Sequence, residues 1–358
     1  MSDKKFWLGL KLIPELDRRL NQAIECFGSP QHVWEATPKD LIEKLGTLPD
    51  VAQKIVTARN KINLDTEFQR LESEGIELLT PSDSHYPMLL REIHSPPILF
   101  TKGDLIKRYS QAVAIVGARR ASSCGKTIAE ELAEELSKLG ITIISGLARG
   151  IDSHAHLGAL KGEGGTIGVL GCGLDIVYPP ENRELYRKIS DEGSLISEQP
   201  LDTPPFAQNF PARNRIISGL SLGVIIVEAG EKSGALITAD FALEQGREVM
   251  VVPGNIKNPL TRGCHGLLKQ GACLVEKVED VMEALNLDVK LNSDSKTSSP
   301  NLSPAEKMIL DKLDWEPKHL EELVKEVNLD ISQVLGLLTT LELKGFVRQD
   351  FGKKISRI

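Results

Sequence analysis

The chain has 358 residues, of which 41% are hydrophobic and 26% are charged, and its formal net charge is −7 at pH 7. This length allows one large core with one or two smaller units, and this composition excludes a globally disordered or fibrous protein. The negative charge argues against a protein coated with positive potential, so any nucleic-acid site has to be a local patch.

The N-terminal part of the chain shows the spacing of helices. From 6 to 71, apolar residues recur three and four positions apart, and prolines stand where new helices would begin. We predict a small helical, SAM-like domain over 1–75. Within it, 40–59 weakly resembles a helix-hairpin-helix, whose turn would give backbone amides to a phosphate. Asp50 and Ala52 stand where that turn needs glycines, so a packing or partner-docking role is favoured over DNA contact.

The central region, 76–287, alternates apolar strands with amphipathic helices. The strands are near-continuous apolar runs, which is typical of strands covered on both faces. A repeated strand, helix, strand order predicts an α/β fold with a doubly wound, mostly parallel sheet and right-handed crossovers. The predicted strands are 112–116, 141–145, 166–170, 194–197, 223–227 and 248–252, and the predicted helices include 126–140, 153–162 and 235–246.

The C-terminal part begins with an abrupt change of composition. Residues 288–303 are rich in Ser, Asn, Asp and Lys, so they bury too little surface to fold, and we predict a linker. Three short amphipathic helices and a strand–turn–strand pattern follow in 304–358, the order of a winged-helix domain. Its third helix, 331–345, is mostly apolar with few donors for bases or phosphates. A protein-interaction or autoregulatory role is therefore favoured over reading duplex DNA.

Ligands of an open α/β sheet bind beyond the carboxyl ends of its strands, so the segment after each apolar run matters. GARRASSCGKT, 117–127, follows the first strand and leads to a helix start with free amides, a positive dipole end and nearby basic side chains. A Walker loop would need glycine at Arg120, and a dinucleotide fingerprint would need glycines at Arg119 and Ser122, so neither is present. An ordinary capped helix with solvated arginines remains the alternative.

The segment after the second strand, GLARGIDSHAHLGAL, places Arg149 at a helix entry. Its D-x-H-x-H string resembles a metal motif, but His154 and His156 would point to nearly opposite faces of a helix. We expect no metal here. Asp152 is expected to cap the helix or to accept hydrogen bonds.

The segment after the third strand, GVLGCGLDIVYPPEN, contains Gly171 and Gly173. These glycines would let the backbone approach a ligand or take a positive φ. Cys172 lies between them without a recognisable histidine partner, so it is predicted to be a buried or lining thiol.

The segment 210–254 contains the most candidate residues for binding a phosphate-bearing ligand. Arg213 and Arg215 flank Asn214 in front of an apolar run, and such a pair of guanidinium groups would suit phosphate oxygens. Phe210, just upstream, is placed to stack on a base.

The next apolar strand leads into EAGEKSGALITA, in which Glu228 follows the strand. Lys232, Ser233 and Gly234 form the turn, and Thr238 lies in the first turn of the following helix. The hydroxyls and amides of this turn would hold a second phosphate.

The compartment is indicated by what the sequence lacks. Its five cysteines form no C-x-x-C pair, and no basic-then-apolar leader or membrane-length apolar run is present. We expect a cytoplasmic protein with no membrane partner.

Six motifs together resemble one family closely. IVGARRAS, SGLARGIDSHAH, GVLGCGLDIVYPPEN, FPARNRIISGLS, IVEAGEKSGALITADFALEQGREVMVVPGN and GCHGLLKQGA resemble the DNA-processing protein A family (DprA, also called Smf), in the family's order, over about 81–285. The resemblance implies an extended Rossmann-like domain, flanked by a helical domain and a winged-helix-like domain.

The resemblance also implies a function. It implies a single-stranded DNA-binding homodimer that protects incoming DNA and loads the RecA recombinase in natural transformation, with no catalytic residue, metal or cofactor. Carried over by motif, the DNA-binding residues would be Arg119, Arg120, Ser123, Gly125, Lys126, Phe210, Arg213, Asn214, Arg215, Lys232, Ser233, Gly234 and Thr238.

One alternative function comes from another class. Phosphoribohydrolases called lonely guy proteins cleave nucleotides on a similar sheet, with a P-G-G-x-G-T turn and a catalytic glutamate. The corresponding stretch here, EAGEKSGALITA, lacks the paired glycines and offers Glu228 or Glu231 only loosely.

Overall fold

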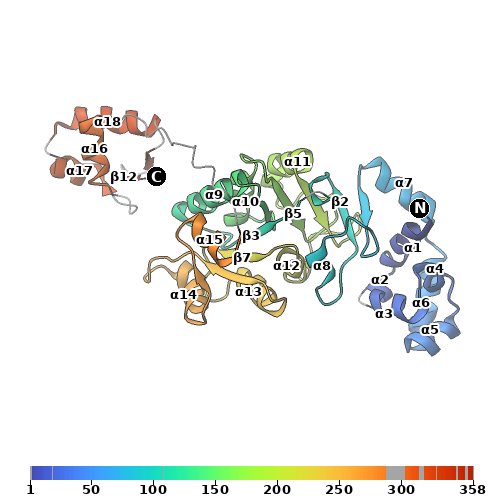
Figure 1. Cartoon of the computed structure of the whole chain (residues 1–358). Coiled ribbons are helices and arrows are strands. Elements are labelled where there is room, and N and C mark those ends of the chain that lie inside the picture. Colours follow the sequence, from blue (N-terminus) through green and yellow to red (C-terminus); the bar gives the residue numbers. More distant parts are fainter. Residues whose placement is uncertain are drawn as a thin grey trace. The chain divides into compact units, whose positions relative to one another are not determined.

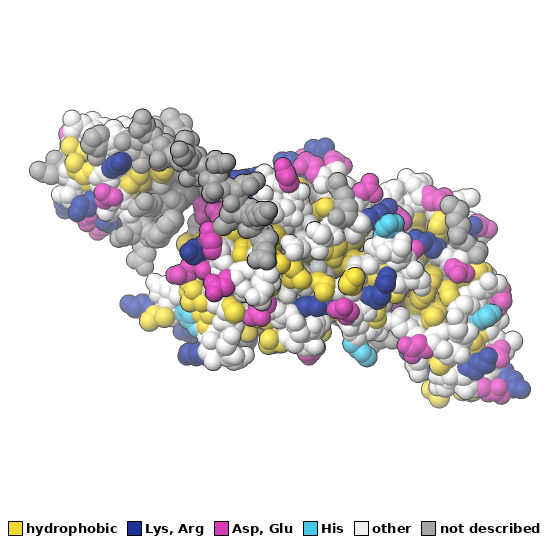
Figure 2. Space-filling model, in the orientation of Figure 1, with side chains coloured by type: hydrophobic (Ala, Val, Ile, Leu, Met, Phe, Trp, Pro, Cys, Tyr) yellow, Lys and Arg dark blue, Asp and Glu magenta, His cyan; other side chains and the backbone are white. Residues whose placement is uncertain are grey.

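A computed structural model describes the chain in two compact units, Met1–Val289 and Lys290–Ile358 (Figure 1). Positive and negative side chains are interspersed over the face shown in Figure 2, in keeping with the modest net charge of −7. No helix among the described residues is long and apolar enough to cross a membrane. The described residues are 2–17, 19–107, 109–287, 303–313, 318–327, 329–343, 346–350 and 354–357.

The first unit begins with short helices whose starts are set by proline. Proline is the first residue of α2, α4, α5 and α6, where its missing N–H and fixed φ suit a helix start. The Ser29 and Thr37 side chains cap α4 and α5. The helices are α1 (Ser2–Lys11), α2 (Pro14–Asp17), α3 (Leu20–Phe27), α4 (Pro30–Glu35), α5 (Pro38–Leu45), α6 (Pro49–Arg59) and α7 (Leu64–Ser73).

These helices share an apolar core with one edge of the sheet. Trp7 and Leu41 from the helices belong to the same buried cluster as Phe100, Leu170 and Leu195 from the sheet region. Burial of each such side chain contributes about 1.5–3 kcal/mol, so the helices and the sheet edge stabilise each other.

The sheet has the order β1-β2-β6-β5-β4-β3-β7-β8-β9. All pairs from β6 to β9 in this order are parallel, whereas β1 and β2 add antiparallel strands at one edge. The predicted doubly wound, mostly parallel sheet is confirmed. The strands are β1 (Glu77–Leu79), β2 (Leu99–Lys102), β3 (Ala112–Val116), β4 (Thr142–Ser145), β5 (Thr166–Leu170), β6 (Ser194–Ser197), β7 (Gly223–Ile226), β8 (Glu248–Val251) and β9 (Cys273–Leu274).

Helices cover both faces of the sheet (Figure 1). The alternation along β3 shows why: Ala112, Ala114 and Val116 belong to one buried cluster, and Val113 and Ile115 to another. One face is covered by α9 (Ser123–Lys138), α10 (Ile151–Ala159), α11 (Arg183–Glu192) and α15 (Val278–Ala284), and the other by α8 (Met88–Arg91), α12 (Asn209–Gly219), α13 (Gly234–Glu244) and α14 (Arg262–Lys269).

The direction of winding reverses at β3. From β3 the chain proceeds through β4, β5 and β6 on one side and returns to β7 on the other. Loops that leave β3 and β7 therefore diverge at the carboxyl edge, which is where open α/β sheets bind ligands.

The second unit is a winged helix, as predicted. It contains α16 (Pro304–Leu310), α17 (Leu320–Val327) and α18 (Ile331–Leu343), with the antiparallel strands β10 (Lys318–His319), β12 (Lys354–Arg357) and β11 (Val347–Asp350) in that sheet order. Its apolar core includes Leu323, Val334, Leu338 and Ile355. The predicted linker lies outside the described residues except for Ser303, whose side chain caps α16.

Candidate functional site

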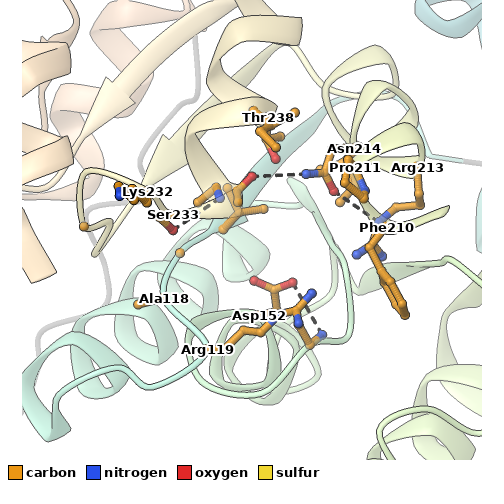
Figure 3. Close-up of a pocket in the computed structure, with 18 of the residues that line it drawn as sticks. Ala118, Arg119, Asp152, Phe210, Pro211, Arg213, Asn214, Lys232, Ser233 and Thr238 are labelled. Carbon is orange, nitrogen blue, oxygen red and sulfur yellow. Dashed lines mark hydrogen bonds between the residues drawn. The ribbon is translucent and has the colours of Figure 1, made fainter. Parts of the chain in front are cut away.

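A pocket of about 590 Å³ opens where the chain leaves β3 and β7. Lys232 and Ser233 form one wall, Phe210, Pro211 and Asn214 the opposite wall, and Arg119 and Asp152 the floor (Figure 3). Of the predicted binding residues, the lining contains Arg119, Phe210, Arg213, Asn214, Lys232, Ser233, Gly234 and Thr238, and it does not contain Arg120, Ser123, Gly125, Lys126 or Arg215.

Two cations of this pocket carry uncompensated charge. The exposed side chains of Arg119 and Lys232 have no hydrogen-bonding or ion-pairing partner among the residues the structure describes. The Arg119 guanidinium lies over the ring of Phe210, with its Cζ 5.6 Å from the ring centroid. A cation and an aromatic face are thus presented together, the combination that suits a phosphate next to a base.

Arg213 is part of the pocket wall, but its guanidinium is engaged by backbone carbonyls. Only 6% of it is exposed, and its Nη1 donates to the carbonyls of Gly146, at 2.8 Å, and Val169. Burial lowers its pKa to about 10, although the nearby Asp152 carboxylate opposes that shift. Arg213 therefore ties α12 to the ends of β4 and β5.

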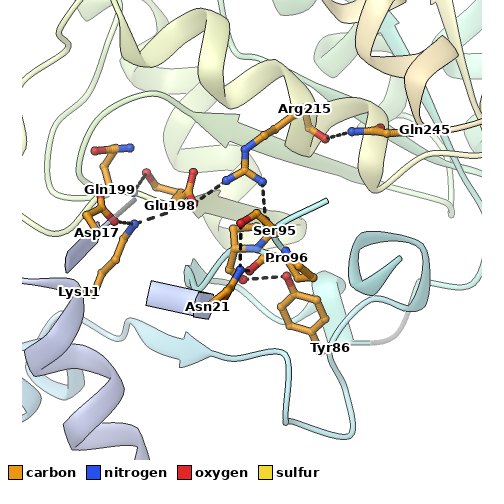
Figure 4. A network of polar contacts seen from close by, with 12 residues as sticks. Lys11, Asp17, Asn21, Tyr86, Ser95, Pro96, Glu198, Gln199, Arg215 and Gln245 are labelled. Atoms are coloured by element: carbon orange, nitrogen blue, oxygen red, sulfur yellow. Dashed lines mark hydrogen bonds and ion pairs between the residues drawn. The ribbon is translucent and has the colours of Figure 1, made fainter. Parts of the chain in front are cut away.

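Arg215 lies away from the pocket. Its guanidinium donates to the Ser95 carbonyl at 3.1 Å and to the Glu198 carboxylate at 2.6 Å, in a network that continues to Lys11 of α1 (Figure 4). The expected fork of Arg213 and Arg215 is wrong, because residues two positions apart on a helix point roughly 200° apart. This arginine holds α12 to the N-terminal helices.

The Asn214 side chain connects the two walls of the pocket, and Ser233 caps the helix of one wall. The Asn214 side chain donates to the Gly234 carbonyl at 3.2 Å, across from α12 to the start of α13. Ser233 is the N-cap of α13, its hydroxyl accepting from the amide of Ala235 at 3.3 Å. Thr238 is 1% exposed, so little of it is accessible at the pocket surface.

The start of α9 is already occupied by a carboxylate. Glu228, 5% exposed, accepts from the Ser122 amide at 2.8 Å and from its hydroxyl at 2.6 Å. A Cβ at Gly125 would lie 2.5 Å from Glu228 Cδ, so the glycine makes room for this carboxylate. Glu228 thus supplies negative charge that the helix dipole favours at this end. The predicted contacts Ser123, Gly125 and Lys126 stay predictions.

The glycines after β5 make room for protein rather than ligand. Neither Gly171 nor Gly173 has a positive φ, and a Cβ at Gly171 would lie 3.0 Å from Phe210 Cδ1. The expected approach to a ligand is therefore replaced by packing against the aromatic side chain. Cys172 is buried, as expected, and burial raises its pKa to about 11.

The residues of the D-x-H-x-H string have separate partners. Asp152, buried, accepts from the amides of Gly146 at 3.2 Å and Ala148 at 3.4 Å, and burial raises its pKa. His154 pairs with Glu130, while buried His156 contacts the Thr166 hydroxyl at 2.7 Å. Asp152 is thus a hydrogen-bond acceptor, as expected, and it fixes the loop after β4.

The pocket also contains residues that the motifs did not identify. Ala148, Ala207, Pro211, Ile217, Ile237 and Leu260 all line it. Small and apolar side chains carry no chemical signal in a sequence, whether they lie in loops or on helices such as α12 and α13. Only the fold shows that they border the site.

Comparison with protein families gives two matches. Residues 77–286 match the model of the DNA recombination-mediator protein A family, and residues 293–353 match the DprA winged helix domain. Protein Smf of Escherichia coli (strain K12) is 36% identical over 356 residues, which are 97% of this chain and 94% of that protein. DNA processing protein DprA of Bacillus subtilis (strain 168) is 44% identical over 261 residues, 70% of this chain and 88% of that protein.

Two solved structures resemble the fold. The X-ray structure of DNA processing protein A from Streptococcus pneumoniae has a TM-score of 0.68 and 36% identity, covering 78% of this chain and 97% of that one. A structure of the Helicobacter pylori protein, solved to describe its single-stranded DNA binding mode, has a TM-score of 0.53 and 32% identity, covering 59% of this chain and 95% of that one.

Proposed function

Because this chain belongs to the DNA recombination-mediator protein A (DprA) family, we propose that it binds single-stranded DNA in the pocket between α12 and α13. The likeness to a structure that describes single-stranded DNA binding supports the ligand. We propose that the protein acts on the strand as a recombination mediator without cutting it.

The observation that carries this proposal is the pair of uncompensated cations. Arg119 lies on the floor of the pocket beside the ring of Phe210, and Lys232 lies on the wall opposite Phe210, in a chain whose net charge is −7. Local positive charge attracts the phosphates, and an aromatic face accepts any base. Such a site binds single strands with little sequence preference.

The structure changes the set of contacts that we propose. Arg119, Phe210, Asn214, Lys232 and Ser233 are accessible at the pocket and are the proposed contacts. Arg213 and Arg215 are proposed to position α12, since their guanidinium groups are engaged by protein oxygens.

Further partners follow from membership of the family. We propose a homodimer in the cytoplasm that protects incoming DNA and loads RecA during natural transformation. A pull-down of RecA with and without single-stranded DNA tests this part. RecA retained only when the strand is present supports loading, and no retention in either case contradicts it.

No residue is proposed to be catalytic. Glu228, the candidate base of a nucleotide-cleaving enzyme, is buried against Ser122, and Glu231 does not line the pocket. The one carboxylate of the described lining, Asp152, is held by backbone amides. Incubation with nucleoside monophosphates is expected to release no free base.

The DNA-binding proposal is tested by titrating a labelled oligothymidylate at several salt concentrations. Arg119→Gln and Lys232→Gln are each expected to weaken binding roughly tenfold, about 1.4 kcal/mol. Each should also lower the slope of log K against log salt by roughly 0.7. Arg187→Gln on α11 is the matched control, because that exposed arginine lies outside the pocket. Equal affinities and slopes for all three variants would contradict the pocket assignment.

A further inference from the structure

A second, smaller cavity shares part of its lining with the pocket. It is lined by Arg119, Ala148 and Phe210, which also line the large pocket, and in addition by residues that include Leu147, Arg149 and Tyr178. Three residues thus border both cavities. We propose that the small cavity is a subsite for one backbone phosphate, that of the nucleotide next to the one in the large pocket. This inference rests on the proposed single-stranded DNA binding.

The volume of the cavity decides which part of a nucleotide it takes. It holds about 20 Å³, against about 590 Å³ for the large pocket. Roughly 10–15 Å³ is needed for a single water molecule. The small cavity therefore has room for one or two phosphate oxygens and excludes a base.

The charges around the cavity suit a phosphate. Arg119 lies in the segment after β3 and Arg149 in the segment after β4, and both arginines line the small cavity. Tyr178, whose ring centroid is 5.4 Å from that of Phe210, has a hydroxyl with no hydrogen-bonding partner among the described residues. Two cations and one free hydroxyl donor are the groups that recognise a phosphate.

In the structure, Arg149 forms an ion pair with a neighbouring glutamate. Its Nε donates to the Glu181 carboxylate, and the two side chains are 56% and 48% exposed. An exposed ion pair of this kind contributes about 1 kcal/mol at most. A phosphate carrying its own charge and placed between two arginines can therefore replace Glu181 as the partner of Arg149.

Hydrogen bonds within the protein hold the loop that carries Arg149 in one conformation before any ligand binds. Leu147 has a left-handed φ of 54°, and its carbonyl accepts from the Asn182 side chain at 2.9 Å. Asn182 also donates to the Ser153 hydroxyl at 2.9 Å, and Asp152 holds the amides of Gly146 and Ala148. A strained conformation maintained by this many hydrogen bonds is typical of a preorganised site.

The test compares Arg149→Gln with Arg187→Gln in the full chain. Both arginines are exposed and paired with carboxylates, so both changes remove the same charge from the surface; Arg149→Gln breaks one surface ion pair and Arg187→Gln breaks two. Oligothymidylate titrations over a salt series are expected to show roughly fivefold weaker binding for Arg149→Gln. The slope of log K against log salt should be smaller by about 0.7 for Arg149→Gln than for the wild type. Arg187→Gln should behave as the wild type.

A second pair of variants tests the competition with Glu181. Glu181→Gln should raise the affinity, because it releases Arg149, while Glu184→Gln on the same surface should not. Identical affinities and slopes for Arg149→Gln and Arg187→Gln would overturn the subsite. If Arg149→Gln and Arg187→Gln are identical but Arg119→Gln and Lys232→Gln weaken binding, the subsite is contradicted and the proposed function is not. If the wild type does not bind the oligonucleotide, the proposed function fails.

Discussion

The carboxylate of Glu228 accepts two hydrogen bonds from Ser122, one from the backbone amide at 2.8 Å and one from the hydroxyl at 2.6 Å. Ser122 in turn caps α9 by accepting from the amide of Gly125 at 3.0 Å. One buried acid thus joins the end of β7 to the start of α9 across the switch point of the sheet.

Removal of this acid should destabilise the fold. Glu228→Ala leaves the Ser122 donors without their acceptor, and we expect a loss of about 1–3 kcal/mol in the free energy of unfolding. Urea denaturation followed by circular dichroism measures the change. Glu231→Ala is the control, because Glu231 is exposed in the same turn. Equal stability of Glu228→Ala and the wild type would contradict this role of Glu228.

Arg213 and Arg215 should differ in what they stabilise. Arg213→Met leaves the carbonyls of Gly146 and Val169 without their buried donor, and each unsatisfied buried group costs about 1–3 kcal/mol. Arg215→Met breaks a partly buried contact with Glu198 and should cost about 1–2 kcal/mol. Thermal unfolding of both variants gives the order of stability. Greater destabilisation by Arg215→Met than by Arg213→Met would contradict the assignment of Arg213 as the buried residue that ties α12 to β4 and β5.

His156 should make the fold sensitive to acid. Burial lowers its pKa from 6.5 to about 3, so between these values the unfolded chain binds a proton that the native chain does not. Stability therefore falls as the pH decreases through 6.5, by about 2 kcal/mol between pH 7 and pH 5. Urea denaturation at both pH values, compared with His156→Gln, isolates this contribution. The same pH dependence in both proteins would rule it out.

The winged helix should be dispensable for binding single strands. The sequence of α18, ISQVLGLLTTLEL, contains no lysine or arginine, and its exposed positions include Ile331 and Leu335. A chain that ends at residue 289 should bind oligothymidylate within roughly twofold of the full chain, because no phosphate contact is lost. A loss of tenfold or more in the same titration would assign DNA contacts to the second unit.

Periodicity was sufficient to predict the buried strands. The predicted 112–116, 166–170 and 194–197 have the bounds of β3, β5 and β6. Strand β2, which has four residues, was missed. The strands β1 and β9 were also missed, because they contain three and two residues, too few for a pattern. Their place in the sheet depends on pairing with β2 and β8 and not on their own composition.

The site could be predicted as a region but not as a set of contacts. The carboxyl ends of parallel strands converge in any such sheet, which brought Arg119, Phe210 and Lys232 together as expected. Which face of α12 meets the pocket depends on tertiary packing, so the sequence could not separate Arg213 from Arg215. The same holds for Glu228, whose partner Ser122 is 106 residues away in the chain.

The core shared by the N-terminal helices and the sheet edge affects how shortened forms of the protein would behave. Phe100, Leu170 and Leu195 are buried in one cluster with Trp7 and Leu41. A chain beginning at residue 76 would expose this cluster to water as an apolar patch that promotes self-association. Oligomers formed by such a fragment would then reflect the uncovered patch and would say nothing about the native assembly.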